Sequence, residues 1–110
     1  MPVVFVNFVF KSYKQMEEPR WMVIVNPKAG SGRGLKDWPA ISNRMYASGL
    51  NFTCLFTEHK YHAIELTVKA INDGFRHIVA IGGDGTVHEV VNGIFIQKAV
   101  LTTDIYLAVI

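Results

Sequence analysis

The 110-residue sequence has little of several features that define other classes of protein. It holds a single cysteine, Cys54, which excludes an internal disulfide and predicts a buried, unreactive thiol in a reducing compartment. Charged residues make up only 18% of the chain, and its 11 basic residues form no run or stripe, which argues against a nucleic-acid partner. Half of the residues are apolar, so the chain is expected to fold as one domain.

The first twenty residues differ from the rest. Met1–Phe10 is apolar and β-prone, but it is far too short to span a bilayer and lacks the basic start and cleavage site of a signal peptide. Lys11–Arg20 is a polar connector. We therefore expect residues 1–20 to form an N-terminal extension or an extra edge strand, and a membrane-contacting segment is the alternative. The domain itself is expected over residues 21–110.

From Trp21 onward, short apolar runs alternate with segments of helical periodicity. Strands are expected at 22–25, 52–56, 78–81 and 106–110. Helices are expected around Trp38 to Met45, around Ile64 to Ile71, and from Thr86 to about Ile96, with Gly49 and Gly74 ending the first two. This β-α-β-α-β-α-β order predicts an α/β fold, a parallel sheet with helices on both faces, and we expect the strand order 2-1-3-4.

A glycine-rich turn follows the third expected strand. Gly82, Gly83 and Gly85 leave the backbone free to adopt positive φ and let another molecule approach its N–H groups. Thr86 and Glu89 have the spacing of a capping box, so Thr86 is the expected N-cap of the next helix. Open N–H groups at a helix start suit a phosphate group.

A second glycine-rich loop, Asn26–Gly34, follows the first expected strand. In the order 2-1-3-4 the first and third strands are neighbours, and the strand order reverses between them. The two glycine loops that follow these strands should therefore face one crevice. Neither loop fits the dinucleotide-binding or P-loop pattern. Asp84 is then an acid beside an expected phosphate, which makes sense if it holds a metal, receives a hydroxyl proton or orients a nucleotide, as kinases require.

Three segments together resemble a known family. They are Asn26–Gly32, reading Asn-Pro-Lys-Ala-Gly-Ser-Gly; Thr57, with His62-Ala63 opening the next helix; and Gly82–Gly93, reading Gly-Gly-Asp-Gly-Thr-Val-His-Glu-Val-Val-Asn-Gly. Over residues 21–110 the chain looks like the diacylglycerol kinase catalytic domain, the family of bacterial diacylglycerol kinase-like lipid kinases, sphingosine kinases and ceramide kinases. Gly-Gly-Asp-Gly-Thr alone is also similar to NAD kinases and, more loosely, to phosphofructokinases.

The resemblance implies transfer of the γ-phosphoryl group of ATP, with Mg²⁺, to a diacylglycerol or sphingoid hydroxyl at a membrane surface, by a cytoplasmic protein. Asp84 matches the acid assigned to the catalytic centre. No residue is assigned to the metal. Residues matching positions that contact ATP are Asn26, Thr57, Gly82, Gly83, Gly85 and Thr86.

Family members continue beyond the fourth strand into a Pro-x-Gly-Thr-x-Asn-Asp type loop and a second, β-rich domain. The resemblance therefore implies that residues 21–110 are a nucleotide-binding part that has little kinase activity alone. Two alternatives are an NAD kinase-like enzyme and a non-catalytic nucleotide-binding fragment. Asn26 can either hold the two loops together or touch the nucleotide, and Thr86 and Glu89 can be purely structural.

Overall fold

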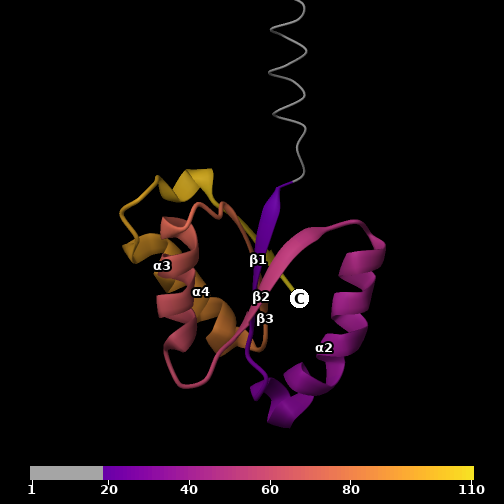
Figure 1. Cartoon of the computed structure of the whole chain (residues 1–110). Helices are drawn as coiled ribbons and strands as arrows, with labels where there is room; N and C mark the ends of the chain where they lie inside the picture. The colour runs from indigo at the N-terminus through magenta and orange to yellow at the C-terminus, as the bar shows by residue number, and fades with distance from the viewer. Residues whose placement is uncertain (1–18) are drawn as a thin grey trace, which may run out of the picture.

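The computed structural model describes residues 19–110 (Figure 1), so the expected extension over residues 1–20 lies almost wholly outside the described part. Strands and helices alternate along the chain as the sequence predicts. The strands are β1 (Arg20–Val25), β2 (Asn51–Phe56), β3 (His77–Ile81) and β4 (Tyr106–Val109). The helices are α2 (Ala29–Ala47), α3 (His62–Asn72) and α4 (Asp84–Ile96), with a short 3₁₀ turn, η1, at Thr102–Asp104.

The four strands form one parallel sheet in the order β2-β1-β3-β4, which confirms the predicted order. Val25 at the end of β1 pairs with Phe56 of β2 and with Ile81 of β3. The three strands therefore end at the same level, and the loops that follow them start side by side. β1 and β3 lie in the middle of the sheet and contain its most buried residues.

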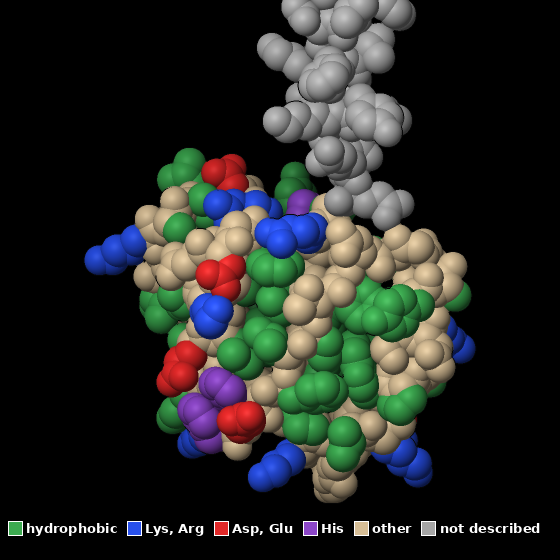
Figure 2. All heavy atoms as spheres, in the orientation of Figure 1, with side chains coloured by type: hydrophobic (Ala, Val, Ile, Leu, Met, Phe, Trp, Pro, Cys, Tyr) green, Lys and Arg blue, Asp and Glu red, His purple; other side chains and the backbone are tan. Residues whose placement is uncertain are grey.

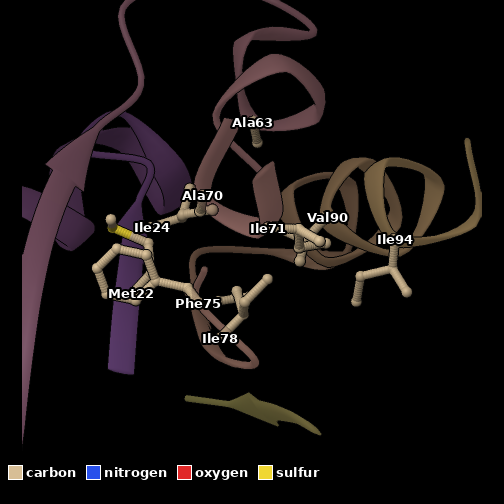
Figure 3. Packing of buried hydrophobic residues seen from close by; sticks show 10 residues of the cluster. Met22, Ile24, Ala63, Ala70, Ile71, Phe75, Ile78, Val90 and Ile94 are labelled. Atoms are coloured by element: carbon tan, nitrogen blue, oxygen red, sulfur yellow. The ribbon is translucent and has the colours of Figure 1, made fainter. Parts of the chain in front are cut away.

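Helices cover both faces of the sheet, which confirms the predicted fold class (Figure 1). Because side chains alternate along a strand, β1 and β3 supply residues to two separate cores. One core packs under α3 and α4 (Figure 3) and includes Met22, Ile24, Ile71, Ile78 and Val90. The other packs under α2 and includes Val23, Val25, Met45, Val79 and Ile81.

Two helix starts differ from the sequence prediction. Helix α2 begins at Ala29, inside the expected loop 26–34, although Gly30, Ser31 and Gly32 have left-handed backbone angles that kink its first turn. Helix α4 begins at Asp84, two residues before the expected cap Thr86. The helix ends are as predicted: Gly49 and Gly74 follow α2 and α3 with φ of 75° and 101°.

Gly93 allows α3 and α4 to approach closely. A Cβ atom at this position would lie 2.7 Å from the Thr67 Cβ and 2.9 Å from the Ile64 carbonyl oxygen. Both Gly93 and Thr67 are buried. The distance between the two helices thus depends on the missing side chain.

We predict that Gly93→Ala lowers the free energy of unfolding by about 1–3 kcal/mol, because the added methyl group must push α3 and α4 apart. Gly85→Ala is the matched control, since it lies in the same helix and a Cβ there would meet nothing within 4 Å. It adds a methyl group to the same helix without the clash. Urea unfolding of both variants measures the difference, and equal stabilities would contradict the packing argument.

Cys54 is half-buried on β2, rather than buried as expected. Burial raises the pKa of its thiol from 9.0 to about 11. The thiol therefore stays protonated at neutral pH, in agreement with the unreactive cysteine that the sequence predicts.

We predict that iodoacetamide alkylates Cys54 about 100-fold more slowly at pH 8 in the folded chain than in urea, because the thiolate fraction falls tenfold for each pH unit by which the pKa rises. The rate in the folded chain should keep rising up to about pH 11. Mass spectrometry of timed samples follows the reaction. A rate that levels off near pH 9 would show an unshifted thiol.

Candidate functional site

The residues directly after β1 and β2 extend the sheet by one hydrogen bond each. The Asn26 N–H donates to the Ile81 carbonyl oxygen at 2.9 Å, and the Thr57 N–H donates to the Val25 carbonyl oxygen at 2.8 Å. Asn26 and Thr57 are therefore held at the carboxyl edge of the sheet by backbone bonds. This is the edge at which ligands bind in open parallel sheets.

The Asn26 side chain joins the loop after β1 to the helix after β3. Its Nδ2 donates to Thr86 Oγ1 at 3.2 Å, and its Oδ1 accepts from the Lys28 N–H at 3.0 Å. Thr86 is 4% exposed, so this bond lies on the inner side of α4. The two loops that were expected to share a crevice are thus connected directly, which is one of the two roles that the sequence left open for Asn26.

The expected capping box is wrong. The N-cap of α4 is Gly83, and it makes no side-chain hydrogen bond. Because the helix starts at Asp84, Thr86 lies inside the first turn, where its N–H donates to the Gly83 carbonyl oxygen at 3.0 Å. Glu89 instead reaches α3, where its Oε1 accepts from the Ala63 N–H at 3.3 Å. Thr86 and Glu89 therefore bond residues that are distant in sequence, Asn26 and Ala63, and do not bond each other's backbone.

A pocket of about 290 Å³ opens at this edge. It brings together three of the predicted site residues, Asn26, Thr57 and Thr86, which come from three different parts of the chain. The complete lining is Asn26, Lys28, Thr57, Glu58, His59, Lys60, Ala63, Thr86 and Glu89. The charged side chains are of both signs, with Lys28 and Lys60 opposite in charge to Glu58 and Glu89.

The predicted glycines do not line this pocket. Gly82 and Gly83 line a neighbouring cavity of about 270 Å³ together with Gly30 and Gly34. Asp84 and Gly85 are exposed at the start of α4 and line neither cavity. The structure thus places Asn26, Thr57 and Thr86 in one cavity, Gly82 and Gly83 in a second, and Asp84 and Gly85 on the surface outside both.

Gly82, Gly83 and Gly85 are free to adopt positive φ but do not do so, since the left-handed glycines among residues 19–110 are Gly30, Gly32, Gly49 and Gly74. Gly82 is required for packing, because a Cβ there would meet Thr86 Oγ1 and lie 2.7 Å from Thr86 Cβ. Gly83 and Gly85 have nothing within 4 Å of such an atom. Their backbone is open to another molecule, as the sequence predicts.

The segment Thr57–Tyr61, which we call the pocket loop, supplies four lining residues, of which the sequence pattern identified only Thr57. Glu58, His59 and Lys60 belong to no recognisable motif. Their position directly after a strand of the central sheet is the signal that points to them. Tyr61 ends the pocket loop in a left-handed conformation, with φ of 67°.

A group of metal-ligand type adjoins the pocket loop. Within residues 19–110, His59, His62 and Glu65 place one candidate ligand atom each within 4.8 Å of the others. The two rings stack at 4.3 Å and 18°, so one ion could not lie in both ring planes, and His62 Nδ1 already accepts from the Glu58 N–H at 2.9 Å. The group also does not fit Mg²⁺, which takes oxygen ligands. Asp84, exposed at the start of α4, has a carboxylate of the kind that Mg²⁺ takes.

No helix within residues 19–110 is long and apolar enough to cross a membrane.

The chain is similar to several lipid kinases. It is 33% identical to the ceramide kinase of Arabidopsis thaliana over 89 residues, covering 77% of this chain and 15% of that protein. It is 34% identical to human sphingosine kinase 1 over 76 residues, covering 68% of this chain and 20% of that protein.

A solved structure has the same fold. A diacylglycerol kinase from Bacillus anthracis str. Sterne superposes with a TM-score of 0.64 at 26% sequence identity, covering 84% of this chain and 32% of that one. The chain spans 25% or less of the length of the curated relatives that it matches. The family described as "Diacylglycerol kinase catalytic domain" matches residues 20–110, and the chain therefore belongs to this family of lipid kinase catalytic domains.

Proposed function

We propose that this chain is the ATP-binding portion of a lipid kinase that transfers the γ-phosphoryl group of ATP to a hydroxyl of a diacylglycerol or sphingoid lipid. The observation that carries the proposal is the pocket in which Asn26, Thr57 and Thr86 meet at the carboxyl edge of the sheet. Each of them matches a position that contacts ATP in the family that the sequence resembles. Their convergence from separate segments supports a shared ligand.

The chemistry of the pocket suits a nucleotide. Thr57 and Thr86 carry hydroxyl groups, and Asn26 is fixed in place by its bonds to Thr86 and to the Lys28 N–H. Lys28 and Lys60 supply positive charge for phosphate groups. The start of α4 lies next to the pocket, and its open backbone at Gly83 and Gly85 adds N–H donors and the positive end of the helix dipole.

Asp84 is the proposed catalytic residue. It is the first residue of α4 and is exposed, so its carboxylate can reach a group bound outside the sheet edge. It would accept the proton of the lipid hydroxyl or orient ATP. Mg²⁺, when bound, would neutralise charge on the phosphates, and Asp84 supplies a carboxylate of the kind that could hold it.

The division of labour within the whole enzyme is part of the proposal. Residues 21–110 would form the nucleotide-binding part, and a second, β-rich domain would contribute to the lipid and metal sites. Residues 1–20 would form an extension outside this part. The enzyme would be cytoplasmic and would meet its lipid at a membrane surface.

We predict that residues 1–110 bind ATP but transfer little or no phosphate to diacylglycerol, because in the proposed division of labour the second, β-rich domain contributes to the lipid site. Asn26→Ala should weaken ATP binding by about tenfold, the value of roughly one hydrogen bond. Asn72→Ala, at the exposed end of α3, is the matched control. Calorimetric titration with ATP and a radioactive transfer assay measure both properties. Turnover at the rate of a full-length relative would contradict the proposed division.

In the full-length kinase, Asp84→Asn should lower turnover by about 10²- to 10⁴-fold while leaving the fold intact, because asparagine cannot accept a proton. Circular dichroism checks the fold. Diacylglycerol, sphingosine, ceramide and NAD offered in competition identify the acceptor. Wild-type turnover by the variant would remove Asp84 from the catalytic centre, and preference for NAD would favour an NAD kinase-like enzyme.

A further inference from the structure

We propose that His62 is a positioning residue that holds the pocket loop, Thr57–Tyr61, in its nucleotide-binding shape, and that it does so only as the neutral imidazole. The inference rests on the proposed function, since it takes ATP as the ligand of the pocket. It assigns a role to a side chain that does not itself line the pocket.

His62 is the first residue of α3 and is bonded back to the loop before it. The ring Nδ1 of His62 accepts from the Glu58 N–H at 2.9 Å, and the backbone N–H of His62 donates to the His59 carbonyl oxygen at 3.2 Å. Its ring stacks on the ring of His59 with 4.3 Å between centroids. The His59 ring in turn makes a 2.9 Å contact from Nδ1 to the Lys60 carbonyl oxygen. Figure 2 shows histidine side chains gathered beside acidic ones on this side of the molecule.

The shape of the pocket loop needs such contacts. Tyr61 has φ of 67°, a left-handed conformation that residues with a side chain rarely adopt and that is kept only where neighbouring contacts enforce it. The carbonyl oxygen of Tyr61 accepts from the Ile64 N–H at 3.1 Å, which starts α3. The turn is thus held at one end by the helix and at the other by the bond from Glu58 to His62.

The held residues are those that form the pocket. Glu58, His59 and Lys60 line it directly, and Thr57 is already fixed to β1 through its N–H. If the bond from Glu58 to His62 is lost, these three residues can move while Thr57 stays. His62 thereby acts on the nucleotide through the loop, without touching it.

Protonation of His62 would release the loop. A neutral imidazole can accept at Nδ1, whereas an imidazolium carries N–H groups at both nitrogens and would point one at the Glu58 N–H. The affinity for ATP should therefore be highest when His62 is neutral and should fall when the imidazole is protonated.

Other charged groups surround His62. His59 stacks on its ring, and Glu65 lies one turn along α3 with a carboxylate within 4.8 Å of the histidine nitrogens. From α4, Glu89 accepts from the N–H of the adjacent Ala63. Lys28 and Lys60 line the same pocket. Because the charge of ATP also depends on pH, the effect of His62 must be measured against a variant that has no imidazole at this position.

The test is ATP binding by the chain at pH 8 and pH 5.5, with EDTA present to exclude metals. In His62→Asn, the side-chain oxygen can accept from the Glu58 N–H at either pH. From pH 8 to pH 5.5, the affinity of the wild-type chain for ATP should fall by a factor about three to ten times larger than the affinity of His62→Asn does. His62→Phe keeps a ring for stacking but has no acceptor, so it should bind weakly at both.

Two control variants locate the titrating group. His88→Ala, exposed on α4, should leave both the affinity and its pH dependence unchanged. His59→Ala removes the stacked ring but keeps His62, so the pH dependence should persist whatever its affinity at pH 8. If the pH dependence disappears in His59→Ala, or if His62→Phe binds ATP as wild type does, the proposal is overturned while the ATP-binding function stands.

A second measurement does not depend on ATP. The protection factor of the Glu58 amide proton against exchange with solvent should be lower at pH 5.5 than at pH 8. In His62→Asn the protection factor should be the same at both pH values. Failure of the wild-type chain to bind ATP at any pH would sink the proposed function alone if this exchange behaviour is seen. Unchanged protection of Glu58 across the pH range would sink the role of His62.

Discussion

Asn26 is the residue on which the arrangement of the site depends. Its backbone N–H continues the pairing of β1 with β3, and its side chain bonds Thr86 on one side and the Lys28 N–H on the other. These bonds fix the loop after β1 against the first turn of α4. Gly82 and Gly34 make the approach possible, because a Cβ atom at either position would clash with Thr86 or with the Asn26 carbonyl oxygen. The arrangement of the two loops therefore depends on the amide side chain of Asn26 and on the absence of side chains at Gly34 and Gly82.

α3 and α4 are joined near the same site. Glu89 bonds the Ala63 N–H at the start of α3, and further along the helices Gly93 lies against Thr67. The pocket loop that precedes α3 is thereby placed relative to α4 as well as to the sheet. Asn26, Thr57 and Thr86 meet because the backbone N–H of each donates to a residue that does not line the pocket.

The sequence predicted the parts of the fold that follow from hydrophobic patterning. The apolar runs at Met22–Val25 and Ile78–Ile81 became the buried central strands, and the strand order expected for this alternation of strands and helices was correct. It failed where a local pattern competed with tertiary contacts. Thr86 and Glu89 have the spacing of a capping box, but Asn26 and Ala63 offered partners that no local rule could foresee. Glu58, His59 and Lys60 were missed because their place in the pocket comes from the strand before them and not from their own residue types.

The alternation of buried side chains along β1 and β3 has a consequence for how the molecule unfolds. Val23 and Val25 belong to one core and Met22 and Ile24 to the other, so each central strand is packed from both sides at once. Removing either helical layer would leave the inner strands half covered, which makes stepwise unfolding unfavourable. The chain should lose its structure in one cooperative transition, and a ligand held at the strand ends would protect amide protons throughout the sheet.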